Sequence, residues 1–338
     1  MNEVQTLLAA FKIPAYRAKQ IVEWIYKHNI YDFSQMKNLP LAMRNLLDEN
    51  FTITSLNLLR KLESSDQKTT KFLLGFSDGV AIETVLMRQS YGNSVCVSTQ
   101  AGCNMGCIFC ASTLNGMVRN LTAGEILAQI IFVNQILKAE NQKVNTIVIM
   151  GSGEPLANYD QVLKFIRLCH EEYILNLGYR NITLSTSGIV PMIEKLADEE
   201  IPITLSISLH APNNLIRSTL MPINKKYEIN AVVTAGKNYG QKTGRRVTYE
   251  YILIADQNDS VHCAQELAQL LRGQLANVNL IPINPVVERG LNRPSPAVIA
   301  AFEETLTKHH IAVTIRREMG NDIQAACGQL RNQHQQLL

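Results

Sequence analysis

The sequence has no long apolar run, and this absence excludes a helix that spans a membrane. None of its apolar runs approaches the length of about 18 residues that such a helix needs. The first residues, MNEVQTLLAAFKIP, contain neither a basic stretch followed by an apolar run nor a small-residue cleavage site. We therefore expect a cytoplasmic protein that is neither secreted nor embedded in a membrane.

A strong net charge is also missing. The chain has 32 Lys and Arg against 29 Asp and Glu, a formal net charge of +3, and its pI is about 8.4. Strongly basic nucleic-acid-binding domains usually have a pI above about 9, so the charge neither requires nor excludes an RNA partner. Hydrophobic residues make up 46% of the chain, which is typical of a globular protein rather than a disordered one.

The cysteines are few for a disulfide-rich protein, and their distribution argues against a disulfide framework. There are seven cysteines, an odd number, and three of them fall within residues 103–110. This clustering fits reduced thiols that bind a metal in a reducing compartment. Cys169 and Cys263 lie in helix-like segments that match no motif, and we predict that both pack in the core.

The patterns along the 338 residues indicate one large catalytic domain with a smaller appendage. Residues 14–51 show the apolar spacing of two or three short helices. The runs KFLLGF and VAIETVLM flank Ser77-Asp78-Gly79, which predicts a β-hairpin. We expect four parts: an N-terminal helical RNA-binding accessory domain (1–60), a β-hairpin connector (61–93), a barrel (94–318) and a C-terminal segment (319–338).

From about residue 94, strand-like and helix-like stretches alternate. The β-branched-rich runs are SVCVSTQ, NTIVIM, NITLST, PITLSISLH, RVTYEYILI, ANVNLIPI and AVTIRRE. Such alternation indicates an α/β fold with a parallel sheet, either doubly wound or barrel-like, and the number of units suits a partial (βα)6 barrel. Thr122-Ala123-Gly124-Glu125 reads as a capping box that begins the helix after the cysteine loop.

Cys103, Cys107 and Cys110 form a C-x3-C-x2-C motif directly after the run SVCVSTQ. Structural zinc usually takes four protein ligands, whereas a cubane iron-sulfur cluster held by three thiolates leaves one iron free to bind a substrate. The motif therefore predicts a 4Fe-4S cluster, with Phe109 shielding it from water. The alternatives are three ordinary buried cysteines, or a zinc site completed by a distant histidine.

Gly151-Ser152-Gly153-Glu154-Pro155 follows the run NTIVIM. Two glycines let main-chain groups approach a ligand closely, and a carboxylate can accept a hydrogen bond from an ammonium. The segment therefore suggests a ligand-binding loop, and the alternative to this role is a plain tight turn after a strand.

The spacing of the three cysteines is the radical S-adenosylmethionine (SAM) signature, and nearly the whole sequence resembles the RlmN/Cfr family of RNA adenine methyltransferases. The resemblance implies a radical SAM barrel, a 4Fe-4S cluster whose open iron chelates SAM, two SAM molecules per turnover, a 5'-deoxyadenosyl radical, and an external electron donor such as flavodoxin. The segments that carry it are AYRAKQIVEWIY, QAGCNMGCIFCAST, MGSGEPLANYD, ITLSTSG, LSISLHAP, NLIPINP and DIQAACGQL.

Members of this family differ in the position that they methylate. RlmN-type enzymes methylate C2 of an adenosine in the peptidyl-transferase centre of 23S rRNA and, in some bacteria, C2 of an adenosine next to the tRNA anticodon; Cfr-type enzymes methylate C8 of the same rRNA adenosine. The segments GEPLANYD, STSG and NLIPINPV are more similar to the RlmN type, so we expect an RlmN-type enzyme. We also expect it to be a monomer. The alternatives are a Cfr-type enzyme, or a non-enzymatic RNA- or zinc-binding protein with the same fold.

The resemblance also implies three catalytic residues. Because C2 of adenine is electrophilic, a protein thiolate first takes the methyl group from SAM, and this residue is Cys327 in AACGQL. After the methyl carbon is attached to C2, Glu83 accepts a proton and Cys96 resolves the adduct by forming a disulfide. Without the resemblance, Cys96 and Cys327 would be interpreted as packing residues and Glu83 as a solvated strand residue.

Further residues are implied as SAM contacts or are candidates for RNA contacts. The SAM contacts follow strand ends, where ligands of such sheets bind, although His210 alone would equally suit a structural role. They are Gly153, Glu154, Ser185, Ser208, Leu209, His210 and Asn284. Cations that could contact phosphates, or simply be solvated, are Arg17, Lys19, Lys27, Lys237, Lys242, Arg245, Arg246, Arg316 and Arg317.

Overall fold

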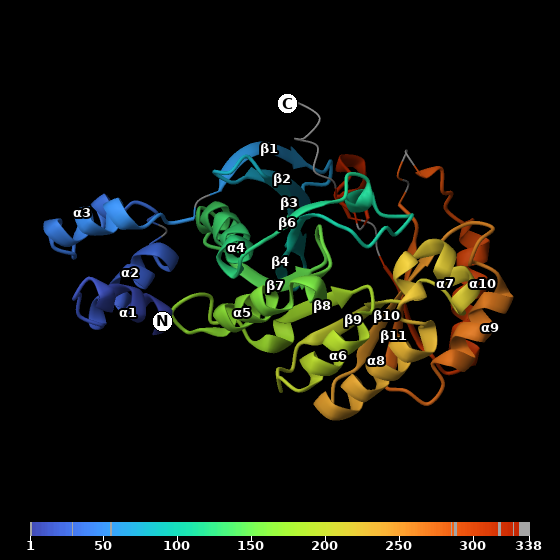
Figure 1. The fold of residues 1–338 in the computed structure, drawn as a ribbon. Helices are drawn as coiled ribbons and strands as arrows, with labels where there is room; N and C mark the ends of the chain where they lie inside the picture. The colour runs from blue at the N-terminus through green and yellow to red at the C-terminus, as the bar shows by residue number, and fades with distance from the viewer. Residues whose placement is uncertain are drawn as a thin grey trace.

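One ten-stranded sheet organises the chain (Figure 1). The computed structural model describes residues 2–28, 30–54, 56–284, 286, 289–316, 319–326 and 328–330, and of Asn2 and Asn321 only the main chain. The strand order is β1-β2-β3-β4-β7-β8-β9-β10-β11-β12, and β5 and β6 form a separate two-stranded sheet.

The strands alternate with helices in the second half of the chain. The strands are β1 (Asn57–Glu63), β2 (Thr69–Gly75), β3 (Ala81–Gln89), β4 (Gly92–Cys96), β5 (Gln100–Gly102), β6 (Met117–Asn120), β7 (Val144–Ile149), β8 (Ile182–Thr186), β9 (Thr204–Ser208), β10 (Val247–Leu253), β11 (Ala276–Pro282) and β12 (Ala312–Ile315). The α-helices are α1 (Asn2–Ala10), α2 (Tyr16–Tyr26), α3 (Leu41–Asn50), α4 (Ala123–Lys138), α5 (Tyr159–His170), α6 (Val190–Ala197), α7 (Asn214–Leu220), α8 (Ile229–Thr243), α9 (Val261–Leu270) and α10 (Pro296–Lys308). Short 3-10 helices are η1 (Phe33–Gln35), η2 (Ala111–Thr113), η3 (Pro155–Asn158), η4 (Tyr179–Asn181), η5 (Pro222–Lys225) and η7 (Asn321–Ile323).

The parallel part of the sheet runs from β4 to β12. Each strand pairs in parallel with the next one, in the order β4, β7, β8, β9, β10, β11 and β12. Helices α4, α5, α6, α8, α9 and α10 follow the first six of these strands in turn. This confirms the predicted partial (βα)6 barrel, and it brings the carboxyl ends of the parallel strands to one edge, where ligands of such folds bind.

Three antiparallel strands extend the sheet beyond β4. The predicted hairpin is present as β2 and β3, with a turn in which Gly79 has φ of 81° and donates from its N–H to the Phe76 carbonyl at 3.1 Å. Strand β1, which we did not predict, pairs with β2. Its side chains are almost all exposed, so the run NLLRKLE lacks the alternation of a half-buried strand.

The N-terminal helices form a module with its own small core beside α4 and α5 (Figure 1). Helix α1 begins at Asn2, before the range in which we expected helices, because Leu8 packs into this core. An ion pair of 2.7 Å between Lys164 Nζ on α5 and Glu3 joins the module to the barrel. The other buried members of the small core are Ala18, Ile21, Phe33, Met36, Leu39 and Leu47.

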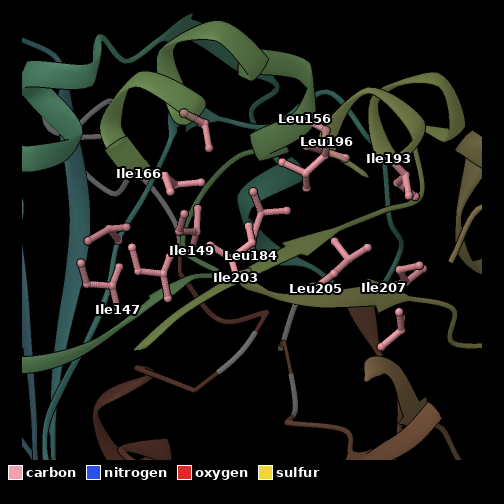
Figure 2. Packing of buried hydrophobic residues seen from close by; sticks show 14 of the residues in the cluster. Ile147, Ile149, Leu156, Ile166, Leu184, Ile193, Leu196, Ile203, Leu205 and Ile207 are labelled. Carbon is pink, nitrogen blue, oxygen red and sulfur yellow. The ribbon is translucent and has the colours of Figure 1, made fainter. Parts of the chain in front are cut away.

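The main core lies between the sheet and its covering helices. Figure 2 shows apolar side chains of β7, β8 and β9, such as Ile147, Leu184 and Leu205, facing those of α5 and α6. Cys169 and Cys263 are buried in this core, as predicted. None of the helices within the described ranges is long and apolar enough to cross a membrane.

Helix α4 joins the sheet to the cysteine loop. Its predicted capping box is present: Thr122 Oγ1 accepts from the Glu125 N–H at 3.2 Å, and Glu125 Oε2 accepts from the Thr122 N–H at 2.8 Å. On the inner face, the fully buried Gln129 accepts from Thr84 Oγ1 at 2.8 Å. The same side chain accepts from the Ser98 N–H at 2.9 Å and donates to the Ser98 carbonyl at 2.8 Å. Gln129 therefore ties β3 to the segment that leads from β4 to the cysteines.

Replacing Gln129 by Leu should lower the free energy of unfolding by about 2–3 kcal/mol, because the buried polar groups of Ser98 and Thr84 lose their partner. Chemical denaturation followed by circular dichroism measures the change. The control is Gln241→Leu on the exposed face of α8, which should change stability by less than about 0.5 kcal/mol. Equal stabilities of the two variants would contradict the role of Gln129.

Candidate active site

The three cysteines of the C-x3-C-x2-C motif line one cavity of about 140 Å³. They lie on the loop between β5 and η2; Cys103 and Cys107 are buried, and Cys110 is partly exposed. Main-chain hydrogen bonds hold this loop, from the Cys103 N–H to the Gly116 carbonyl at 3.1 Å and from the Ile108 N–H to the Leu220 carbonyl at 3.1 Å.

The thiols of this cavity need a positive partner in order to ionise. Burial, together with the neighbouring Cys110, raises the pKa of Cys103 to about 12, and burial with both neighbouring cysteines raises that of Cys107 well above its usual range. A cationic metal centre replaces these protons when it binds. Among the described residues, no three His, Cys, Asp or Glu side chains converge on a single ion. The thiolates of a cluster each bind a different iron, so their spacing is wider than that of ligands to one ion.

Much of the rest of the cavity wall comes from the carboxyl-terminal ends of β8 and β9 and from the loops that follow β7, β8 and β9. Gly153, Glu154, Ser185, Ser208 and His210 all line it. These expected SAM contacts are therefore brought to the cysteines by the tertiary structure.

Glu154 joins two of these loops. Its carboxylate accepts from the Leu156 N–H at 3.0 Å, from Thr186 Oγ1 at 2.7 Å and from the Ser187 N–H at 2.6 Å. Burial raises the pKa of Glu154, and the hydrogen bonds to Ser187 and Thr186 oppose this effect. A carboxylate offers about four acceptor positions, so one is left for a ligand ammonium.

Neighbouring protein atoms leave no room for a side chain at either glycine of the GSGEP segment. Gly153 has φ of 109°, and a Cβ on it would lie 2.6 Å from the Gln100 Cβ. A Cβ on Gly151 would lie 2.6 Å from the Val97 carbonyl oxygen. Close packing against the segment after β4 thus explains both glycines, in addition to the approach of a ligand that the sequence suggested.

His210 is held as a neutral imidazole at the wall of the cavity. Its Nδ1 accepts from the Ile252 N–H at 3.0 Å, which assigns the proton to Nε2. Burial, with Arg217 nearby, lowers its pKa to about 3. Its ring meets Phe109 edge to face, with 4.7 Å between ring centroids. Leu209, by contrast, is fully buried and is not among the residues that line the cavity.

A second, larger cavity of about 530 Å³ adjoins the first. The two share Met150 and Ile281 in their walls. Cys96 and Asn284 line the larger cavity and not the smaller one. Cys96 lies opposite Val85 in the register of β3 and β4.

Glu83 lies beside the larger cavity in a buried ion pair. It shares a face of β3 with Val85, which lines the cavity, because side chains two residues apart in a strand point the same way. Its Oε1 is 2.9 Å from Lys71 Nζ, and both side chains are almost fully buried. Sequence reasoning missed Lys71, whose only signal is its place opposite Val85 in the hairpin register.

Cys327 and Arg317 lie outside the residues that the structure describes. The residues on either side of Cys327 reach different cavities: Ala326 lines the larger one, and Gly328 lines the smaller one. Hydrogen bonds hold both flanks. Lys71 Nζ donates to the Gln324 carbonyl at 2.9 Å, the Ala111 N–H to the Gly328 carbonyl at 2.7 Å, and Ser112 Oγ to the Leu330 carbonyl at 2.7 Å.

Glu250 is a second residue that sequence reasoning missed. It lines the smaller cavity and accepts from Ser185 Oγ at 2.9 Å and from Ser208 Oγ at 3.4 Å. Arg316 Nη1 lies 3.4 Å from its other oxygen. The only signal in the sequence is a carboxylate inside the apolar run RVTYEYILI.

The candidate cations for RNA are widely separated. Arg316 lines the larger cavity. Lys242 pairs with Asp198, and Arg245 donates to Thr204 Oγ1, at the amino ends of β9 and β10 and thus at the sheet edge away from the cavities. Lys19 of the N-terminal module lies over the Tyr173 ring, 5.4 Å from its centroid.

Two family models match the sequence. The Radical SAM superfamily model matches residues 97–269, and the model named Ribosomal RNA large subunit methyltransferase N-terminal domain matches residues 1–53.

Individual proteins match over nearly the whole chain. The chain is 52% identical to a probable dual-specificity RNA methyltransferase RlmN of Symbiobacterium thermophilum, covering 99% of this chain and 90% of the relative. Its identity to the protein of that name from Clostridium perfringens is 50%, and the match covers 95% of this chain and 91% of that relative. The crystal structure of a radical SAM methyltransferase from Sphaerobacter thermophilus superposes with a TM-score of 0.95 at 44% identity, covering 98% of this chain and 97% of that one.

Burial of His210 should make stability depend on pH. Its folded-state pKa of about 3 lies below the ordinary value of about 6.5, so its contribution is complete above pH 6.5 and is lost as the pH falls. Between about pH 7.5 and pH 5, the wild type should lose about 2 kcal/mol more free energy of unfolding than His210→Asn, since Asn tolerates the φ of 57° at this position. Chemical denaturation at both pH values measures this; equal losses would contradict it.

Proposed function

This chain belongs to the RlmN family of the radical SAM superfamily, and on that basis we propose that it methylates C2 of an adenosine in 23S rRNA and of an adenosine next to the tRNA anticodon. The cofactors of this family are a 4Fe-4S cluster and SAM. The observation that carries the proposal is the pair of adjoining cavities, one lined by the three motif cysteines and the other by Cys96.

The residues of the smaller cavity fit the cofactors. Three thiols face one space and suit a cluster that leaves an iron open. On the other wall, hydroxyls and carboxylates can bind the polar groups of SAM. When bound, the cluster and SAM supply a 5'-deoxyadenosyl radical that removes a hydrogen atom from a methyl group. The residues that we assign to SAM are Gly153, Glu154, Ser185, Ser208, His210, Glu250 and, from the adjoining cavity, Asn284, with Leu209 as part of the turn that places its neighbours.

Three protein residues carry out the other steps of the reaction. The Cys327 thiolate takes a methyl group from SAM by nucleophilic displacement, and this carbon is later attached to C2 of the adenine. Glu83 accepts the proton that leaves C2, and the unpaired electron of the adduct would return to the bound cluster, from which it came. The Cys96 thiolate then attacks the Cys327 sulfur, a disulfide forms, and the bond from that sulfur to the new carbon breaks. The base leaves with its methyl group after it takes up a proton, and reduction of the disulfide restores the enzyme.

The larger cavity is suited to a flipped adenine. Its volume of about 530 Å³ is within the range of small-molecule sites, and Val85, Met87 and Val148 give it an apolar wall. Extrusion of the base costs a few kcal/mol, which contacts to the flanking phosphates must offset. Of the cations that the sequence suggested for RNA contacts, Arg316 is the one described residue that lines this cavity, and we assign it that task. We assign further RNA contacts to the N-terminal part, residues 1–60, and methyl transfer to residues 94–338.

The proposed product is testable by mass spectrometry of nucleosides from 23S rRNA and tRNA treated with the reconstituted enzyme. We expect 2-methyladenosine from the wild type and from Cys169→Ala, because the Cys169 thiol of the wild type lies in the core away from both cavities. Cys107→Ala should give none, because the cluster loses a ligand. Detection of 8-methyladenosine alone would show Cfr-type chemistry and refute the proposal.

Replacing Lys71 by Met should separate the early and late steps of the reaction. Glu83 takes no part in methyl transfer to Cys327, so intact-protein mass spectrometry should still find one methyl group on that residue. Without the ammonium 2.9 Å away, the buried Glu83 carboxylate loses its opposite charge, and product formation should fall by about ten-fold or more. A covalent protein–RNA adduct should accumulate on denaturing gels.

The conservative variant Lys71→Arg is the matched control, because it keeps the positive charge and should restore product formation. Loss of the methyl group in Lys71→Met would mean that Lys71 acts mainly through its hydrogen bond to the Gln324 carbonyl. Absence of the methyl group from the wild type would refute the two-step mechanism itself.

A further inference from the structure

Arg217 on α7 is a fully buried cation whose hydrogen bonds to the described residues go to neutral acceptors. A guanidinium has five N–H donors. Here they reach the Leu209 carbonyl (3.2 Å), Asn224 Oδ1 (3.0 Å), the Tyr227 carbonyl (3.1 Å), the Ser187 carbonyl (2.7 Å) and the Ser208 carbonyl (3.4 Å).

No carboxylate of the described residues balances the charge of Arg217. Across the described part of the chain, no Asp or Glu oxygen lies within 4.0 Å of its guanidinium nitrogens. Burial lowers its pKa to about 10, which leaves it charged at neutral pH. A buried charge without an opposite charge is strongly destabilising, so a nearby anion is expected in the working protein.

The cysteine loop is the place for this anion, because the end of α7 packs against it. Leu220 and Met221, at the end of α7, share an apolar cluster with Cys107 and Phe109. The Leu220 carbonyl also accepts the main-chain hydrogen bond from Ile108 inside the cysteine loop. Burial raises the pKa of Cys107, and the positive group that opposes this effect is Arg217.

We propose that the charge of Arg217 balances the negative charge of the iron-sulfur cluster and raises its reduction potential. The inference rests on the proposed function, in which Cys103, Cys107 and Cys110 hold the cluster. A four-iron cluster with three thiolates is anionic and gains a further negative charge when it takes up an electron. A fixed cation stabilises the reduced form more than the oxidised form, and net charge is one of the factors that set cluster potentials.

Two substitutions separate the charge of Arg217 from its hydrogen bonds. Arg217→Gln removes the charge, whereas Arg217→Lys keeps it; neither replaces all five hydrogen bonds. The potential of the reconstituted full-length protein is measured by dithionite titration with mediators, and the reduced cluster is followed by electron paramagnetic resonance. We expect a more negative potential in Arg217→Gln, a potential near the wild-type value in Arg217→Lys, and a lower thermal midpoint in both.

Arg272→Gln is the matched control, because this exposed arginine follows α9 and precedes the amino end of β11, at the other edge of the sheet. Its potential should equal that of the wild type. Asn224→Asp is a second, independent variant that places a carboxylate on the atom that already accepts from Arg217 at 3.0 Å. It should shift the potential in the same direction as Arg217→Gln, even if Arg217→Gln fails to fold.

Equal shifts in Arg217→Gln and Arg217→Lys, or no shift in Arg217→Gln or Asn224→Asp, would overturn the role of the charge. A wild-type protein that binds no iron after anaerobic reconstitution would instead overturn the proposed function. The two failures are therefore distinguishable by the iron content and absorbance of the wild type.

Discussion

The main-chain groups at the carboxyl ends of the parallel strands must find hydrogen-bond partners, and the site depends on how this is done. Beyond the strands there is no ladder to satisfy them, and a buried unpaired peptide group is costly. Buried polar side chains take this role: Gln129 binds Ser98 after β4, and Asn258 binds the carbonyls of His210 and Ile252. Because these partners are supplied by the protein, the loops stay in place while the thiols remain available.

The same constraint explains why charged residues lie in the interior. Glu154 receives three donors from the loops after β7 and β8, and Arg217 gives its donors to segments after β8 and β9. In the low dielectric of this region, each charge acts strongly on its neighbours. Residues that secure the loops therefore also set the electrostatic environment of the cysteines.

The proposed reaction needs two separate spaces that share a wall. Under the proposed function, one holds the groups that generate a radical, and the other holds the base and the resolving thiol. Met150 and Ile281 border both cavities, and the residues on either side of Cys327 reach one cavity each. The C-terminal segment is held at Lys71 of the hairpin and at Ala111 and Ser112 next to the cysteine loop. The hairpin thus serves the site as well as extending the sheet.

Local patterns in the sequence were sufficient for the strands and helices of the barrel and for the cysteine motif, whereas the other candidate residues on its loops came from the family resemblance. Strands in the parallel sheet, the capping box at Thr122 and the cysteine motif each depend on neighbours within a few residues, so they can be read directly. The partners of Glu83, Arg217 and Glu250 could not be read in this way. Lys71 meets Glu83 only through the hairpin register, and Ser185 meets Glu250 only because β8 and β10 flank β9. The sequence by itself determined which chemical groups are present and which elements carry them; the tertiary structure alone decided which groups meet, because burial and pairing bring together residues that are distant in the chain.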